Sequence, residues 1–181
     1  MVYLILFFLV AIIFLFSSKR FSPIPYFPSQ PVDMHLIVKM LKLKNNQMVI
    51  DLGAGDGIVI FSAAQQSYKQ KLNTKFLAVE INPILILILH LRRLFHPNKK
   101  NIKIIRDDIF TMDYSRLTIN NYELTIYLYI SPWYLEKTIL NVKNQIPKFS
   151  VVSYMYSIKS LKKIEEIVTG KNNIYIYSGK S

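Results

Sequence analysis

The sequence predicts an α/β fold in which parallel strands alternate with helices. Three of the chain's five glycines lie in the pentapeptide 53–57, directly after the apolar run Met48–Leu52. A chain so poor in glycine gathers it where the backbone must pass close to something. The apolar run suits a buried parallel strand, and Ile58–Gln65 suits the helix that follows it. Repeated units of this kind indicate a Rossmann-like, mostly parallel sheet.

The remaining elements follow from the same patterns. Met34–Leu43 has apolar residues at helical spacing, and Asp33 is a candidate N-cap for this helix. Trp133–Asn144 is a second candidate helix. Further apolar runs of strand length are Phe76–Val79, Ile102–Arg106, Leu124–Tyr129, Phe149–Tyr156, Ile164–Val168 and Ile174–Tyr177. The last two flank a turn-forming segment that begins at Gly170, and this arrangement predicts a closing hairpin.

One more helix should begin at Asn82–Pro83, an N-cap residue followed by proline at the first helical position. The segment Ile84–Leu89 is then apolar at every position. A helix that covers a sheet normally shows one polar face to water. The pattern leaves two readings open. Either the outer face of this helix meets lipid or a partner, or the segment is buried by its neighbours or is itself a strand.

The glycines mark a candidate cofactor site. They lie at a strand-to-helix turn, where open α/β sheets bind nucleotide-like ligands. Roughly twenty residues further on, the second strand ends in Glu80, an acid suited to the two hydroxyls of a ribose. The alternative is a turn that only tightens the packing of helix on strand.

Two nucleotide cofactors compete for this site. The dinucleotide fingerprint G-x-G-x-x-G requires its third glycine at position 58, which is Ile58, and the glycine comes one residue earlier. Asp51 and Asp56 also place carboxylates beside the turn. Two acids suit a cationic cofactor better than a pyrophosphate.

The pattern Asp-Leu-Gly-Ala-Gly-Asp-Gly, with Glu80 after the second strand, resembles the cofactor loop of class I methyltransferases. The resemblance implies S-adenosyl-L-methionine (SAM) as cofactor and a mostly parallel sheet whose final strand is antiparallel. In this family an acid after the third strand accepts from the adenine amine, and the next residue offers its backbone N–H to the ring. The matching cofactor residues are Asp51, Gly53, Gly55, Asp56, Gly57, Glu80, Asn82, Asp108 and Ile109.

From about Gln30 to Ser157, the order of segments is most similar to the small membrane-anchored protein-lysine methyltransferases, which include the enzyme acting on the ATP synthase c-subunit. The resemblance implies a lysine ε-amine as methyl acceptor. An apolar, aromatic-lined channel would keep that amine neutral. The candidates for this channel are Tyr127, Tyr129, Ser131 and Trp133. The two tyrosines share one side of their strand, so a place in the core is the alternative.

The N-terminal segment predicts a membrane anchor. Met1–Phe16 carries no charged side chain and, with Ser17 and Ser18, is long enough to span a bilayer. The basic pair Lys19–Arg20 follows the run and no A-x-A-like cleavage site is present, which favours a signal anchor over a cleaved signal peptide. The positive-inside rule then places the catalytic domain in the cytoplasm, on a single-pass protein of the cell membrane. The alternative is an uncleaved buried helix.

The predicted organisation is therefore an anchor at 1–18, a basic and proline-rich connector at 19–32, and a methyltransferase domain at 33–181. The chain has no cysteine, which excludes disulfides and thiolate metal sites, and its three histidines are scattered, so no metal is expected. The net charge of +12 suits an anionic surface such as acidic lipid headgroups or nucleic acid, or reflects solvated lysines alone.

These observations together predict a SAM-dependent methyltransferase at the membrane surface, acting on a protein lysine. The sequence Ser131-Pro132-Trp133 also resembles the loop of nucleic-acid amino-methyltransferases, without that loop's middle proline. A nucleic-acid enzyme is thus one alternative, although an anchor disfavours nucleic acid as a partner. A lipid or quinone methyltransferase and a non-catalytic SAM-binding scaffold are the others. Neither the methyl acceptor nor the oligomeric state is fixed by the sequence.

Overall fold

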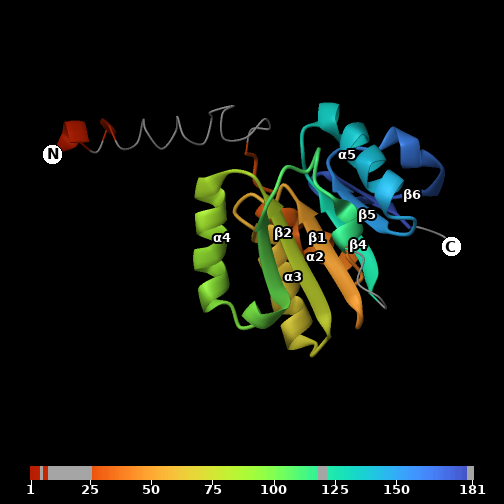
Figure 1. The fold of residues 1–181 in the computed structure, drawn as a ribbon, viewed down its shortest axis with the longest axis horizontal. Helices are drawn as coiled ribbons and strands as arrows, with labels where there is room; N and C mark the ends of the chain where they lie inside the picture. The colour runs from red at the N-terminus through yellow and green to blue at the C-terminus, as the bar shows by residue number, and fades with distance from the viewer. Residues whose placement is uncertain (5, 8–25, 118–121, 179–181) are drawn as a thin grey trace.

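The computed structural model describes residues 1–4, 6–7, 26–117 and 122–178. Its centre is a seven-stranded sheet in the order β3-β2-β1-β4-β5-β7-β6, in which β7 is antiparallel to both of its neighbours (Figure 1). The strands are β1 Gln47–Leu52, β2 Thr74–Glu80, β3 Ile102–Arg106, β4 Glu123–Leu128, β5 Ser150–Tyr154, β6 Glu165–Thr169 and β7 Asn173–Tyr177. The predicted Rossmann-like sheet with an antiparallel final strand is confirmed.

The helices cover the two faces of this sheet (Figure 1). They are α2 Met34–Met40, α3 Ile58–Lys69, α4 Pro83–Phe95 and α5 Pro132–Gln145, with short 3₁₀ helices η1 Pro31–Asp33, η2 Lys99–Asn101, η3 Tyr114–Leu117 and η4 Lys159–Ile164. Alternate residues of β1 enter opposite cores. Ile50 packs in the core shared with α5, whereas Val49 packs in the core shared with α2, α3 and α4. Because successive strand side chains point to opposite faces, one apolar strand serves both layers.

The chain order of the strands creates a crevice in the sheet. From β1 the chain moves outward through β2 to β3 and then returns to β4 on the other side of β1. The loops after β1 and β4 therefore leave the sheet in opposite directions, and ligands bind in open α/β sheets outside the carboxyl ends of the strands at such a switch point.

Asp33 does not serve as the expected N-cap of α2. It lies at the N-cap position, but its side chain makes no capping hydrogen bond. Its buried carboxylate instead accepts from the Tyr154 hydroxyl and from the backbone N–H groups of Lys171 and Asn172, at 2.7, 2.7 and 3.0 Å. Burial alone would raise the pKa of Asp33, yet these hydrogen bonds outweigh burial and lower it. Asp33 thus ties the start of α2 to the β6–β7 turn.

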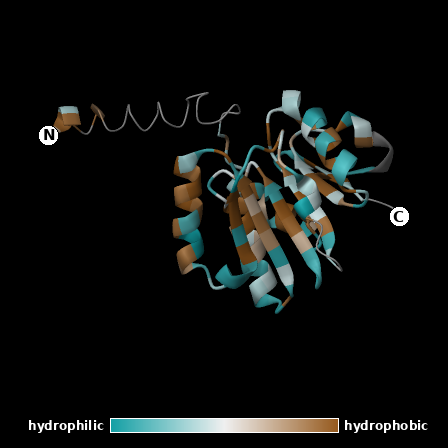
Figure 2. Cartoon of the chain, in the orientation of Figure 1, coloured by the Kyte–Doolittle hydropathy of each residue, from teal (hydrophilic) through white to brown (hydrophobic). Residues whose placement is uncertain are grey.

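The predicted N-cap role of Asn82 at the start of α4 is confirmed. Its side-chain oxygen accepts from the backbone N–H groups of Ile84 and Leu85, so Asn82 caps α4. The segment Ile84–Leu89 is therefore helix and not strand. In Figure 2 this helix is mostly apolar, although it lies at the outside of the molecule.

Within the described ranges, no helix is both long enough and apolar enough to cross a bilayer. The expected anchor at 1–18 falls mostly on residues 5 and 8–18, which lie outside those ranges. The anchor therefore remains a prediction.

Candidate cofactor and acceptor site

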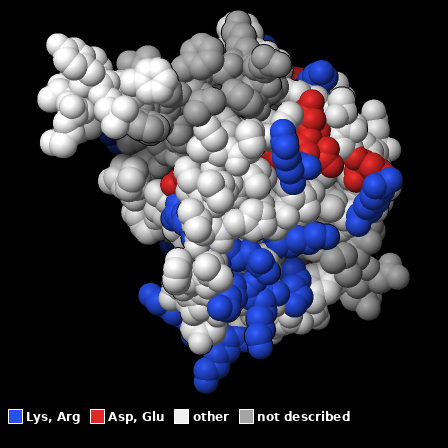
Figure 3. Space-filling model, turned by 60° about the vertical axis from the view of Figure 1, so that its left-hand side comes forward, with Lys and Arg blue, Asp and Glu red and all other residues white. Residues whose placement is uncertain are grey.

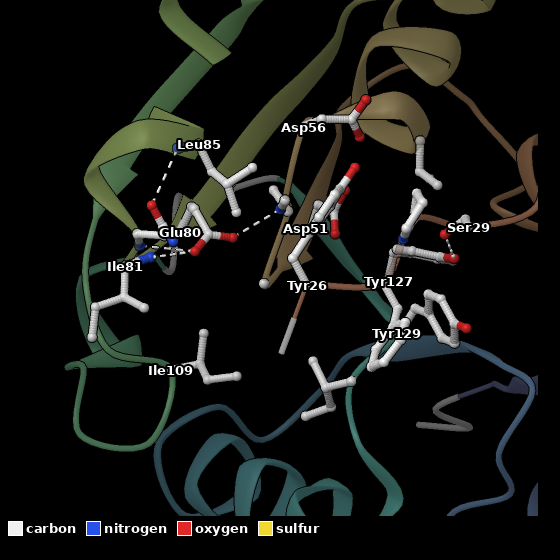
Figure 4. Close-up of a pocket in the computed structure, with 18 of the residues that line it drawn as sticks. Tyr26, Ser29, Asp51, Asp56, Glu80, Ile81, Leu85, Ile109, Tyr127 and Tyr129 are labelled. Carbon is white, nitrogen blue, oxygen red and sulfur yellow. Dashed lines mark hydrogen bonds between the residues drawn. The ribbon is translucent and has the colours of Figure 1, made fainter. Parts of the chain in front are cut away.

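One cavity opens at the carboxyl ends of β1, β2 and β4 (Figure 4). Its volume is about 790 Å³ when the space in its open mouth is included. Several segments far apart in the sequence contribute to its wall. The lining residues are Tyr26, Phe27, Pro28, Ser29, Asp51, Gly53, Ala54, Gly55, Asp56, Ile58, Val59, Glu80, Ile81, Asn82, Leu85, Asp107, Asp108, Ile109, Phe110, Tyr127, Tyr129 and Ile130.

The three glycines after β1 all have left-handed backbone, with φ of +81°, +59° and +79° at Gly53, Gly55 and Gly57. A side chain at any of them would be strained. Gly53 and Gly55 line the cavity, and a Cβ on Gly55 would lie 2.6 Å from a ring carbon of Tyr26. The first two glycines therefore keep the floor of the cavity open.

Gly57 lies where two helices pack together, and it is not among the residues that line the cavity. It is the residue that precedes α3. A Cβ there would lie 2.5 Å from a methyl carbon of Leu89 in α4 and 2.7 Å from the ring of Phe61 in α3. Its missing side chain thus lets α4 pack closely on the start of α3, and the cofactor role predicted for Gly57 has no contact with the cavity to support it.

Glu80 is held by three backbone groups at the end of β2. One carboxylate oxygen accepts from Gly55 N–H at 2.8 Å, and the other accepts from Ile81 and Asn82 N–H at 2.9 Å each (Figure 4). A carboxylate offers about four lone-pair sites, so these three bonds leave one for a ligand hydroxyl. Glu80 therefore fastens the glycine turn to β2 as well as facing the cavity.

Asp51 is the least satisfied acid of the site. The residue is 3% exposed and lines the cavity, and its carboxyl receives no hydrogen bond from the described residues. Burial, together with the smaller effect of the negative charges on Glu80 and Asp56, raises the pKa of Asp51 to about 8. A cationic ligand group in the cavity would relieve this unfavourable environment.

The charge of the wall contrasts with that of the chain. Five acids line the cavity, namely Asp51, Asp56, Glu80, Asp107 and Asp108, and no lysine, arginine or histidine lines it among the described residues. The chain as a whole carries 23 basic and 11 acidic residues. We call these five residues the acidic set. A negatively charged wall disfavours a pyrophosphate and favours a ligand with positive charge.

The loop after β3 contributes Asp108 and Ile109 to the wall, as the resemblance implied. Asp108 accepts from Phe110 N–H at 2.9 Å, and Asp107 accepts from Asp108 N–H at 2.8 Å. These bonds hold the loop in a turn beneath the cavity. Ile109 lies across the cavity from Tyr129 in Figure 4.

The four expected acceptor residues are not all brought together. Tyr127 and Tyr129 line the cavity, whereas Ser131 and Trp133 do not. Tyr127 is buried and its hydroxyl is 2.7 Å from the Ser29 hydroxyl, while the Tyr129 ring packs edge-on against Tyr154. Ser131 precedes α5, and Trp133 in its first turn is 87% exposed. Helix α5 begins at Pro132, and this start turns the Trp133 side chain outward.

Four lining residues were missed because they fall in the proline-rich segment assigned as a connector. Tyr26, Phe27, Pro28 and Ser29 form one side of the cavity, so the packed domain extends beyond the expected boundary at Asp33. The Tyr26 hydroxyl hydrogen-bonds Asp56, and burial followed by that acid raises the pKa of Tyr26 to about 12. The adjacent aromatic residues Tyr26 and Phe27, inside a proline-rich stretch, were the feature of the sequence that could have indicated a packed segment. We call Tyr26, Phe27, Phe110, Tyr127 and Tyr129 the aromatic set.

No protein-family model and no curated protein matches this sequence. Solved structures do. An RNA methyltransferase from Salinibacter ruber, crystallised with S-adenosyl-L-homocysteine, has a TM-score of 0.68 and 19% identity over 86% of this chain and 95% of its own. A precorrin-6y C5,15-methyltransferase from Geobacter metallireducens GS-15 has a TM-score of 0.57 and 16% identity over 83% of this chain and 91% of its own.

A SAM-dependent methyltransferase from Geobacter sulfurreducens, also with S-adenosyl-L-homocysteine, has a TM-score of 0.51 and 13% identity, over 81% of this chain and 57% of its own. None of these three is described as a protein-lysine enzyme or as membrane-anchored, so that part of the expectation stays a prediction. At these identities the comparisons establish the architecture. The chain therefore has the class I fold of SAM-dependent methyltransferases.

Proposed function

We propose that this chain is a SAM-dependent methyltransferase. The observation that carries the proposal is the acidic set around a cavity that no lysine, arginine or histidine lines among the described residues. SAM carries a sulfonium and an ammonium group and no phosphate, so its charge complements this wall. Asp51 is the candidate partner for a cationic group, Glu80 for ribose hydroxyls and Asp108 for the adenine amine.

The residues of the chain fit that cofactor. SAM supplies an electrophilic methyl group, which needs an in-line nucleophile. Gly53 and Gly55 allow close approach of a ligand to the backbone, and the three N–H donors on Glu80 fix the orientation of its carboxylate. Catalysis then rests on positioning and on exclusion of water rather than on a general base.

We further propose a lysine ε-amine of a membrane protein as the methyl acceptor. The aromatic set supports an amine acceptor, because an apolar surrounding disfavours the ammonium form and leaves the lone pair free. The Tyr129 hydroxyl is a candidate to accept from that amine, whereas the Tyr127 hydroxyl is already engaged with Ser29. The predicted N-terminal anchor would concentrate the domain near loops and tails of membrane proteins.

An experiment with labelled SAM tests both the proposed methyl transfer and the proposed lysine acceptor. Membranes and soluble lysate from cells lacking the gene would be incubated with the full chain and with an Asp51→Asn variant as control. We expect label on membrane proteins with the wild-type chain alone, and mass spectrometry should find it as methyl-lysine. Label only on lipid or quinone would overturn the lysine acceptor and keep the methyltransferase. SAM binding without any labelled product would indicate the non-catalytic scaffold.

A nucleic-acid acceptor is the second candidate. Ser131, Pro132 and Trp133 do lie at the carboxyl end of β4, next to the cavity residues Tyr129 and Ile130. Two features count against it: the missing middle proline of the motif, and the predicted anchor. Label recovered in RNA or DNA, in amounts above the Asp51→Asn control, would favour this candidate.

A further inference from the structure

The outer face of α4 is an apolar surface with nothing packed on it among the described residues. Leu89 packs in the core, and the buried Leu85 lines the cavity. Leu87, Leu91, Leu94 and Phe95 point outward, and each is more than half exposed. These four positions follow helical spacing and form one stripe along the helix. A soluble helix normally turns charged side chains to this side.

The C-terminal end of this stripe is bordered by lysines. Lys99 and Lys100 follow α4 and are exposed, and within the described residues neither of them belongs to a salt bridge. Figure 3 shows the lysines and arginines gathered at one end of this face. Between Gly57 and Arg106 the sequence has nine basic residues and one acid, the buried Glu80. The local surface is therefore strongly positive.

We propose that the stripe of α4 and its lysine border form a docking surface for an anionic lipid bilayer. Apolar residues on one helix face, with basic residues at the side, are the pattern of helices that lie in the plane of a membrane interface. The leucines and Phe95 enter the boundary between headgroups and acyl chains. Lys99 and Lys100 face acidic headgroups, which attract juxtamembrane cations.

The composition of this surface favours lipid over the other occupants of a basic or apolar face. A nucleic-acid surface is built from polar and stacking side chains along a basic groove, and a stripe of three leucines offers neither. A dimer interface between two copies would bring the same uncompensated positive charge together, which costs free energy. An acidic bilayer satisfies both the charge and the apolar area.

Docking through α4 also has a consequence for the cavity. Asn82 and Leu85, at the start of α4, line the cavity wall. A bilayer against α4 would therefore lie near the cavity mouth and restrict acceptors to those at the membrane surface. The docking surface itself requires no methyl transfer, so it is tested separately from the proposed activity.

Because the chain has no cysteine, single fluorophores can report each face of the full-length protein. An environment-sensitive NBD label would be placed at Leu91→Cys in α4 or, as a matched control, at Leu140→Cys in α5. These leucines are 53% and 51% exposed, and their helices flank opposite faces of the sheet. Both proteins would be reconstituted in phosphatidylcholine vesicles with and without phosphatidylglycerol, so the anchor is the same in every sample.

We expect the Leu91→Cys label to shift to shorter wavelength and to be quenched by brominated lipid in the anionic vesicles, while the Leu140→Cys label stays water-exposed. Replacing Lys99 and Lys100 with glutamate should reverse the shift. Equal water exposure of both labels in anionic vesicles would overturn the proposal. So would a shift without vesicles that grows with protein concentration, or a shift caused by added RNA without lipid quenching.

Discussion

The acidic set and the aromatic set meet in one cavity but are held in different ways. Glu80 is fixed by three backbone N–H groups from segments that adjoin the turn after β1 and the end of β2. Tyr127 and Tyr129 are fixed by side chains from distant segments, Ser29 and Tyr154. Backbone contacts at strand ends give a rigid cofactor site, whereas the aromatic set depends on a segment ahead of the first helix. The first set should therefore control binding, and the second should control transfer.

The largest expected effect is that of Gly55→Val. A valine there meets the ring of Tyr26 at its Cβ and must adopt a φ of +59°. We expect SAM binding to be abolished, while the free energy of unfolding without ligand falls by only about 1–2 kcal/mol for the backbone strain. Calorimetric titration and thermal unfolding of the full chain measure the two quantities. Retained SAM binding would mean that the glycine turn is not the cofactor floor.

Glu80→Ala should weaken SAM binding by about 1–3 kcal/mol, since a ligand hydroxyl loses a charged acceptor. It should also destabilise the protein without ligand, because three backbone N–H groups lose their partner. Glu80→Gln is the matched control, since its amide oxygen keeps part of the acceptor function. If Glu80→Ala changed stability and left SAM affinity intact, Glu80 would be structural only.

The pH dependence of Asp51 gives a third test. Its pKa is raised from 3.8 to about 8 in the folded protein, so between these values the unfolded chain binds fewer protons than the native one. The contribution of Asp51 to the free energy of unfolding should therefore fall as pH rises through this window. A cationic ligand favours the ionised carboxylate, so SAM affinity should rise, up to about fiftyfold, from about pH 6 to about pH 8.

The control for this test is Asp51→Asn, which removes the titrating group. In this variant, the pH dependence of SAM affinity and the contribution of Asp51 to the pH dependence of the free energy of unfolding should both disappear. Calorimetric titration and denaturant unfolding at each pH measure the two quantities. The same affinity slope in Asp51→Asn and in wild type would assign the titration to another group.

The smallest expected effects on cofactor binding come from the aromatic set. Tyr129→Ala should lower methyl transfer by about 10- to 100-fold through misplacement of the acceptor, with SAM affinity changed less than about threefold. Trp133→Ala is the comparison, because Trp133 is 87% exposed and lies off the cavity, and it should affect transfer less. Initial rates of transfer from labelled SAM into membranes measure both. A larger loss for Trp133→Ala would place acceptor recognition on the surface at α5.

Four of the five members of the acidic set could be predicted because they lie at or near the ends of individual strands. Asp51, Asp56, Glu80 and Asp108 each stand within a few residues of the carboxyl end of β1, β2 or β3, and parallel strands bring these ends to one edge. The strands were recognisable as apolar runs. The antiparallel direction of the final strand came from the family resemblance.

The remaining features of the fold and the site could not be predicted, because they depend on contacts between segments that are far apart in the sequence. The Ser29–Tyr127 hydrogen bond joins residues 98 positions apart, so the sequence gives no local sign that 26–29 close the cavity. The same reason explains Asp33, whose partners Tyr154 and Lys171 lie far along the chain. Gly57 is a third case, since its neighbour Leu89 belongs to another helix.

The most direct test of the central claim compares ligands by thermal unfolding of the full chain. A ligand that binds only the native state raises the melting temperature by mass action. The acidic wall predicts that SAM and S-adenosylhomocysteine raise the melting temperature of the wild-type protein, that Gly55→Val abolishes both shifts, and that NAD causes none. A shift with NAD, together with none from SAM or S-adenosylhomocysteine, would contradict the account.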